Sequence, residues 1–312
     1  MQYTIAFYNI ENLFDIHNDP FTNDDDFLPT SDKRWTQKKY DRKIYKIGSV
    51  ISQIGTDENT TPPAIVGLAE VENKRVLKDL LASKDLQSIN YDYVHYNSLD
   101  ERGIDVALIY NKDVFTVNSS ETFNVFITDE DGEIDFTRDV LLVSGMLGEE
   151  EIHIIVNHWP SRREGEEASS YKRVLAAQKN IEVVNRLKQE NPNSKIIVMG
   201  DFNDNPNDDS VEELVAGANL YNPMQNLRSI DKGSLNHDFN WNVFDQIMVS
   251  INFLETKPNT LKFSDANIFD SKFLTQYNGK YKGQPYRTFV GKKYKGGFSD
   301  HFPVFIELRK TD

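Results

Sequence analysis

The nine residues Lys195-Ile196-Ile197-Val198-Met199-Gly200-Asp201-Phe202-Asn203 carry the strongest structural signal in the chain. An apolar run of β-type residues stops there at an acid and an amide. Side chains repeat every two residues along extended chain, so Asp201 and Asn203 share one side of the strand end. One carboxylate and one amide placed in this way can act on a common phosphate, with Asp201 binding or deprotonating a water molecule.

The same pattern, an apolar run that stops at an acid, an amide or a histidine, recurs over most of the chain. It recurs at Asn9, Glu70, Asp105, His158, Asp245, Asp300 and His301. Strands that end in this way deliver their terminal side chains to one rim of a sheet. Many oxygen donors, in a chain without any cysteine, suit a hard divalent cation such as Mg²⁺ or Mn²⁺. The pattern therefore predicts an enzyme.

Two of these positions are expected at the metal. Glu70 ends the apolar run 64–69, where an unpaired buried carboxylate would be costly and a metal bond would satisfy it. Asn9 ends the run 5–8, and its amide oxygen can bind Mg²⁺ or orient a phosphate, although a lone Asn is more often a turn residue.

His158 and His301 are the histidines that stand at the ends of apolar runs next to polar residues. Two histidines that converge with several carboxylates favour acid–base catalysis over a structural role. Each needs an acid to fix its tautomer and to stabilise the imidazolium. Asp245 and Asp105 are the candidates for this role.

Three arginines adjoin the predicted strands and could grip phosphate with their planar guanidinium groups. They are Arg102, Arg138 and Arg162. The cluster 161–163 could equally be a solvated turn.

Strand candidates outnumber helix candidates along the chain, and no repeat or linker interrupts them. The strand candidates are 3–9, 64–70, 91–96, 104–110, 123–127, 139–147, 152–158, 195–200, 243–249 and 302–308. The helix candidates are 34–54, 72–83, 168–189 and 209–216. This order does not fit the strict alternation of a doubly wound fold. We expect an α/β fold of two packed sheets flanked by helices, as a single domain over residues 1–312.

The hydropathy of the chain predicts a protein that does not cross a membrane, and we expect a monomer. No apolar run is long enough to span a bilayer. Strand-like sequence begins at residue 3, so we expect no signal peptide in the chain. A cytoplasmic protein and a secreted protein whose signal has been removed both remain open.

The formal net charge of −14 argues against a general attraction to nucleic acid or anionic membrane. The charge is unevenly spread, however, because segment 271–299 has no acid and carries seven lysines and arginines interleaved with seven aromatic residues. A cationic, aromatic loop beside an anionic metal cluster suits a polyanionic substrate with stackable bases. The alternative is an ordinary solvated loop with aromatic side chains packed beneath it.

Together these stretches resemble the endonuclease/exonuclease/phosphatase superfamily, from Asn9 through Pro303 and in the order of the family's motifs. Gly200-Asp201-Phe202-Asn203 and Ser299-Asp300-His301-Phe302-Pro303 are the most specific stretches. The stretch 157–162 is most similar to a bacterial, endonuclease-like branch. The resemblance implies a four-layer α/β sandwich of two mostly antiparallel sheets, with the site at one end.

The resemblance also implies roles for individual residues. It places Asn9, Glu70 and Asp300 around the metal, and Asp201 with Asn203 around the attacking water and the phosphate. It pairs His301 with Asp245 and His158 with Asp105, and it assigns Arg138 to the phosphate.

These features predict metal-dependent hydrolysis of phosphodiester bonds, with DNA as the favoured substrate. We expect Asp201 or His301 to take the proton of the attacking water and His158 to protonate the leaving oxygen. A phosphatase or phosphodiesterase for a small or lipid phosphoester is the alternative, and the net charge supports it. A catalytically silent, partner-binding relative is the third possibility, which the complete set of acids, amides and histidines disfavours.

Overall fold

Two six-stranded sheets form the centre of the molecule in the computed structural model, which describes residues 1–57, 59, 61–128, 132–163 and 165–311. The first sheet has the order β15 (Leu261–Ile268), β18 (Val304–Lys310), β1 (Gln2–Leu13), β2 (Ile65–Val71), β4 (Asp105–Asn111) and β3 (Tyr91–His95). The second has the order β11 (Leu220–Tyr221), β14 (Asp245–Ser250), β10 (Lys195–Asp201), β9 (Glu150–His158), β8 (Val140–Leu147) and β5 (Phe115–Phe123). In these sheets β1 pairs with β2 and β9 with β10 in parallel, and the other pairs are antiparallel.

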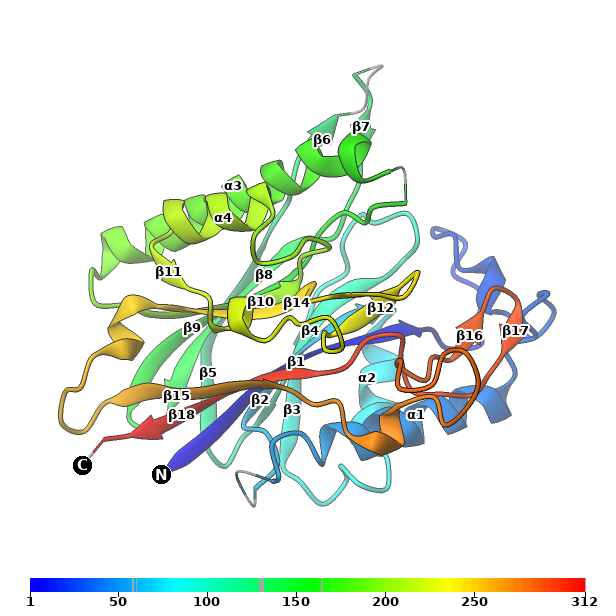
Figure 1. Cartoon of the computed structure of the whole chain (residues 1–312), viewed down its shortest axis with the longest axis horizontal. Helices are drawn as coiled ribbons and strands as arrows, with labels where there is room; N and C mark the ends of the chain where they lie inside the picture. The colour runs from blue at the N-terminus through cyan, green and yellow to red at the C-terminus, as the bar shows by residue number, and fades with distance from the viewer. Residues whose placement is uncertain (58, 60, 129–131, 164, 312) are drawn as a thin grey trace.

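Helices cover the outer faces of both sheets, which confirms the expected sandwich (Figure 1). The helices α1 (Gln37–Ile51) and α2 (Lys74–Leu81) lie on one side, and α3 (Glu166–Glu190) and α4 (Asp209–Gly217) lie on the other. Within the described ranges, no helix has the length and apolar content that crossing a membrane requires.

The central strand β10 separates two hydrophobic cores by simple alternation of its side chains. Ile197 and Met199 belong to the core between the sheets, whereas Ile196 and Val198 pack under α3 and α4. The sheets approach closely at Gly67, because a Cβ there would lie 2.5 Å from the Met199 sulfur. This contact brings the end of β2 near the end of β10.

Shorter elements lie in the connections between the longer strands and helices. They are β6 (Ile127–Thr128), β7 (Ile134–Asp135), β12 (Leu235–His237), β13 (Asn240–Asn242), β16 (Phe289–Val290) and β17 (Lys293–Tyr294), with 3₁₀ turns at Asp25–Phe27, Pro223–Asn226, Ile251–Leu254 and Lys272–Leu274. The β12–β13 and β16–β17 hairpins project on the right in Figure 1, away from the two chain ends.

The sequence-based prediction was wrong at two outer strands. The strand expected at 123–127 lies upstream, as β5, and β15 was not predicted at all. Both are outer strands of their sheets, and their sequences are largely polar, with exposed residues in the middle of each. An outer strand that leaves one face in water needs no continuous apolar run, so the hydrophobic pattern does not reveal it.

Candidate active site

Asp201, the last residue of β10, lies at the centre of the polar site. Its Oδ2 accepts a hydrogen bond from Asn9 Nδ2 at 2.9 Å, and its Oδ1 accepts one from the Asn203 backbone amide at 3.0 Å. The same Oδ2 is 3.8 Å from His158 Nε2 and 4.0 Å from His301 Nε2. Burial raises the pKa of Asp201 to about 6, although the charge of His301 opposes the rise. Residues from four separated stretches therefore converge on one carboxylate.

Gly200 allows β10 to reach this point. A Cβ at position 200 would lie 2.5 Å from the carbonyl oxygen of Asn157 on the neighbouring strand β9. A side chain here would force β9 and β10 apart at the place where they present His158 and Asp201.

His301 and Asp245 form a close pair, as the sequence suggested. The imidazole Nδ1 lies 2.7 Å from Asp245 Oδ2, and Asp245 is fully buried. Burial disfavours the imidazolium, but the charges of Asp245 and Asp201 outweigh it and raise the pKa of His301 well above its ordinary value. The geometry therefore holds a positive charge on His301.

The surroundings of His158, the last residue of β9, favour the neutral imidazole, whereas those of His301 favour the charged one. Its side chain is 3% exposed, and Nδ1 has no hydrogen-bond partner among the described residues. Burial, followed by the charges of Arg138 and Arg102, lowers the pKa of His158 well below its ordinary value. A neutral imidazole is thus placed on the other side of Asp201.

The expected hydrogen bond between His158 and Asp105 does not form in the described structure. Asp105 Oδ1 accepts the Ser98 amide at 2.9 Å, and Oδ2 lies 3.5 Å from His95 Nε2. Asp105 begins β4 and His95 ends the adjacent strand β3, so the acid pairs within its own sheet. His158 belongs to the other sheet.

Asn9 and Glu70 do not end their strands but lie at irregularities inside them. The β1–β2 pairing shifts register between Asn9 and Leu13, and Glu70 adopts φ +66°. Bulges of this kind redirect side chains next to active sites. Glu70 Oε2 accepts the Asn12 amide at 2.7 Å, while Oε1 is 4.0 Å from Arg102 Nη2.

A cluster of charges that the sequence did not reveal lies behind Asp300. Arg287 Nη2 donates to Asp300 Oδ2 at 2.7 Å and lies beside Glu11, whose carboxylate accepts the Thr288 and Phe289 amides at 2.5 and 3.2 Å. The charges of Asp300, Glu11 and Glu70 raise the pKa of Arg287 against the effect of burial. Three carboxylates therefore face one guanidinium.

Lys43 of α1 completes this cluster. Its side chain is buried, and Nζ donates to Thr288 Oγ1 and to the Phe298 carbonyl, each at 2.5 Å. Burial lowers the pKa of Lys43 to about 8, and burial raises the pKa of Glu11 to about 7. A lysine beside an apolar helical stripe is ordinarily solvated, so no local pattern identified Lys43.

The arginines expected to bind phosphate differ in how many of their N–H groups already donate hydrogen bonds within the protein. Arg138 donates to the carbonyls of His158 and Trp159 at 3.2 and 2.8 Å and to Asp100 Oδ2 at 2.9 Å. It therefore holds the end of β9. Arg102, which is 29% exposed in its side chain, donates to Asn12 Oδ1 at 2.6 Å. Both arginines line a cavity of about 190 Å³.

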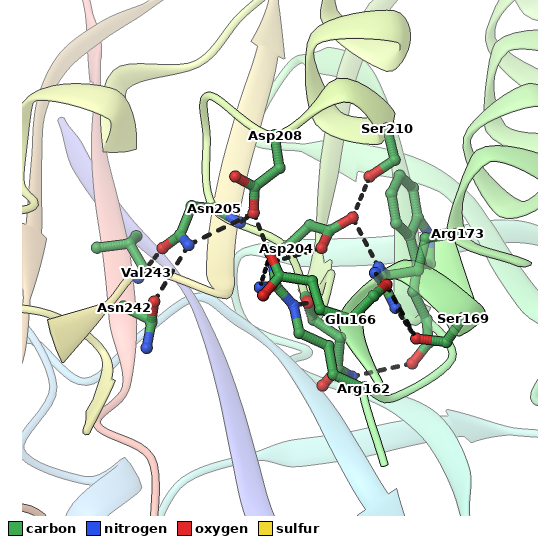
Figure 2. A network of polar contacts seen from close by, with 12 residues as sticks. Arg162, Glu166, Ser169, Arg173, Asp204, Asn205, Asp208, Ser210, Asn242 and Val243 are labelled. Carbon is green, nitrogen blue, oxygen red and sulfur yellow. Dashed lines mark hydrogen bonds and ion pairs between the residues drawn. The ribbon is translucent and has the colours of Figure 1, made fainter. Parts of the chain in front are cut away.

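Arg162 is neither a free phosphate ligand nor a solvated turn residue, because it joins a partly buried ionic network (Figure 2). It contacts Asp204 and Asp208 at 2.5 Å and Glu166 at 2.6 Å, and it donates to the Asn203 carbonyl at 2.7 Å.

On its other side, Asp204 contacts helix α3. Arg173 Nε lies 2.7 Å from Asp204 Oδ2, and Ser210 Oγ donates to the same oxygen at 2.6 Å. Figure 2 shows that the network ties the loop after β10 to α3 and α4. The backbone that presents Asp201 and Asn203 is thereby fixed.

Asn203 itself turns toward the protein. Its Nδ2 donates to the Trp159 carbonyl at 3.0 Å, and its backbone has φ +51°. The residue therefore links the end of β9 to the end of β10.

Comparison with known proteins finds matches for the chain as a whole. The model of a family described as the endonuclease/exonuclease/phosphatase family matches residues 4–310. No curated protein matches the chain by sequence.

Several solved structures share the fold at low sequence identity. An endonuclease/exonuclease/phosphatase family protein from Bacteroides thetaiotaomicron is 20% identical with a TM-score of 0.62, and the match covers 99% of this chain and 98% of that one. A mannosyl-6-phosphatase from the same species is 19% identical with a TM-score of 0.60, covering 98% and 99%. A humanized D. rerio TDP2 is 16% identical with a TM-score of 0.54, covering 99% of each chain. At these identities the likeness concerns the fold alone.

Proposed function

Because the chain belongs to the endonuclease/exonuclease/phosphatase family, we propose that it is a phosphoesterase that hydrolyses phosphodiester bonds in DNA with a bound divalent cation, Mg²⁺ or Mn²⁺. The proposal treats residues 1–312 as one catalytic domain that acts as a monomer. The observation that carries it is the convergence of His158, the His301–Asp245 pair and Asn9 on Asp201.

The proposed cation site is formed by Asn9, Glu70 and Asp300. Glu70 and Asp300 each use one carboxylate oxygen in a hydrogen bond recorded among the described residues, and hard oxygen donors of this kind suit Mg²⁺. Glu11 lies beside the same guanidinium as Asp300, so three carboxylates meet the buried Lys43 and the partly exposed Arg287 in this region. The donor set therefore fits a divalent ion.

Among the described residues, the acids and histidines whose possible ligand atoms lie within 4.8 Å of one another are Asp201, Asp245 and His301. We assign this group to proton handling instead, because His301 Nδ1 already lies 2.7 Å from Asp245. His301 Nε2 lies 4.0 Å from Asp201 Oδ2, so both ring nitrogens of His301 face carboxylates.

The protein residues divide the work of hydrolysis around Asp201. A bound divalent cation supplies Lewis-acid stabilisation of the charge on the phosphate oxygens. Asp201 orients the attacking water and accepts its proton. His301, held by Asp245, adds positive charge beside the non-bridging oxygens. As the water oxygen bonds to phosphorus, the bond to the leaving oxygen breaks, and that oxygen takes its proton from the His301 imidazolium or from solvent. His158 lies on the other side of Asp201 as a neutral hydrogen-bonding group.

Replacement of Glu70 with alanine tests the proposed cation site. We expect the variant to lose at least about 10²-fold in kcat/KM, because Lewis-acid stabilisation of the transition state contributes several kcal/mol. Wild-type activity should also disappear in EDTA and return with Mn²⁺, measured with a chromogenic phosphodiester.

Glu212→Ala is the matched control, because Glu212 is an exposed carboxylate on helix α4. Full activity of wild type in EDTA, or equal activity of Glu70→Ala and Glu212→Ala, would refute the assignment.

A phosphatase acting on a small phosphoester is the second candidate. The net charge of −14 favours it. In the basic loop, residues 271–299, two of the cations already face acids: Lys292 pairs with Asp32, and Arg287 pairs with Asp300. One protein of the same fold is a mannosyl-6-phosphatase.

Salt dependence separates the two candidates. If the substrate is DNA, kcat/KM for plasmid cleavage should fall steeply between 50 and 200 mM salt, roughly in proportion to the number of phosphates contacted. Replacing Lys292 and Lys293 together with alanine should flatten this dependence and leave a small chromogenic diester unaffected. A salt-insensitive reaction with DNA, or no reaction with DNA beside rapid turnover of a phosphate monoester, favours the second candidate.

A further inference from the structure

The β12–β13 hairpin is attached directly to the catalytic end of the molecule. Leu235 forms an isolated β-bridge with His301, and the Phe302 amide donates to the Ser234 carbonyl at 2.6 Å. On the other strand of the hairpin, the Trp241 ring stacks on Phe302 with centroids 6.1 Å apart. A ligand held by this hairpin would therefore lie beside His301.

A shallow hollow of about 440 Å³ opens on the outer side of the hairpin. It is lined by Arg228, Ser229, Ile230, Phe239, Asn240 and Trp241. Ile230 and Phe239 are 98% and 54% exposed, which is unusual for neighbouring large apolar side chains. The hollow is distinct from the arginine-lined cavity beside His158.

The tip of the hairpin holds an aromatic pair in the solvent. Phe239 stacks on Tyr281 from the basic loop, with centroids 5.6 Å apart and planes 5° apart. Lys280 Nζ lies 5.1 and 5.2 Å from the two ring centroids. This arrangement combines flat aromatic faces with a positive charge.

The backbone at the tip is in a conformation that a bulky residue rarely adopts. Asp238 and Phe239 have φ +46° and +66°, at turn positions where Asn and Gly are usual. A large aromatic side chain held there without burial is explained more readily by a ligand than by packing.

We propose that Phe239, Tyr281 and Trp241, with Lys280 and Arg228, bind unpaired nucleobases of the strand whose phosphodiester is cleaved. This inference rests on the proposed function. The rings supply stacking surfaces for bases, and the two cations face the phosphates between them. Asp231 and Asp238 are the acids closest in sequence to these groups, so the surface carries both positive and negative charges. Binding of the DNA strand would therefore depend on base stacking more than on charge.

The position of the hairpin also determines which form of DNA can bind to it. The turn that holds Phe239 is about three residues beyond Leu235, or about 10 Å along the hairpin, so stacked bases would lie a few nucleotides from the scissile phosphate. Bases in a duplex are stacked on each other and are not free to pack on Phe239. The surface therefore selects a single-stranded or frayed substrate.

Binding in EDTA tests the surface without catalysis. The probes are a short fluorescent single-stranded deoxyoligonucleotide, the same backbone with abasic units, and the matching duplex. We expect wild-type protein to bind the base-bearing strand at least about 10-fold more tightly than the abasic strand. The double variant Phe239→Ala with Tyr281→Ala should lose this preference and bind both strands alike. Both side chains are substantially exposed, so the variant should fold normally.

The control variant is Phe126→Ala, which removes an aromatic ring that is 71% exposed between β5 and β6. It should keep the full preference for bases. Equal binding of base-bearing and abasic strands by wild type, or tighter binding of the duplex, would overturn the inference.

The same oligonucleotides with Mn²⁺ separate this inference from the proposed function. Cleavage of base-bearing and abasic strands with equal kcat/KM leaves the phosphodiesterase proposal intact and refutes the base-binding surface. Turnover of a sugar phosphate with no cleavage of any oligonucleotide refutes both. A faster reaction with the base-bearing single strand that is lost in the double variant supports both.

Discussion

Replacing His301 with alanine is expected to lower kcat for phosphodiester hydrolysis by about 10²–10⁴-fold, the range for a group that handles charge or protons in the transition state. His301 is the side chain that Asp245 holds in a charged form beside Asp201. His158→Ala should reduce the rate within the same range, because the imidazole contacts Asp201 from the opposite side. Steady-state kinetics on a chromogenic diester at saturating Mn²⁺ provide the measurement.

Two further variants sharpen this test. Asp245→Asn keeps the shape of the pair but removes the charge that stabilises the imidazolium, so its rate should fall nearly as far as that of His301→Ala. His17→Ala is the control, since that histidine is exposed. Near-full activity of both His301→Ala and His158→Ala would show that the site does not use these residues.

Replacing Arg173 with methionine is expected to cost about 3–5 kcal/mol in the free energy of unfolding, because one partner of a buried ion pair is left without the other. The Arg173 side chain is 1% exposed, and its partner Asp204 is 6% exposed. Arg162 remains next to Asp204, but Asp204 Oδ2 loses its cation. Denaturant unfolding followed by circular dichroism measures the change.

Lys179→Met is the matched control for this prediction. Lys179 lies on the same helix, and its ion pair with Glu182 is solvent-exposed on the acid's side. Such a surface pair contributes about 0–1 kcal/mol, so the control should unfold almost like wild type. Equal destabilisation by the two substitutions would mean that the network in Figure 2 does not anchor the loop after β10.

The local sequence was sufficient to predict the strands that carry the site. The apolar run before Asp201 predicted a buried strand, and β10 extends to that residue. The pairing of His301 with Asp245 followed from the family resemblance and is present at 2.7 Å. Signals of this kind survive because buried strands need continuous apolar side chains, and any acid that ends one must find a partner.

The local sequence could not predict which side chains pair with each other between strands and between sheets. Asp105 was expected to orient His158, but it faces His95, since sheet membership decides which side chains meet. No role in the site was predicted for Glu11 or Lys43, for a related reason. They belong to stretches far apart in the chain, and only the packing of α1 against the loop after β15 buries them together.

The amino-acid sequence alone indicated the family and the two-sheet architecture, and it pointed to most of the side chains that lie around Asp201, because short patterns of apolar runs and terminal polar residues carry this information. Tertiary structure decided how those groups pair, which arginines are used internally and where aromatic rings remain in solvent. The physical reason is that hydrogen bonds and ion pairs form between side chains close in space. Local sequence constrains that closeness only along a single strand or helix.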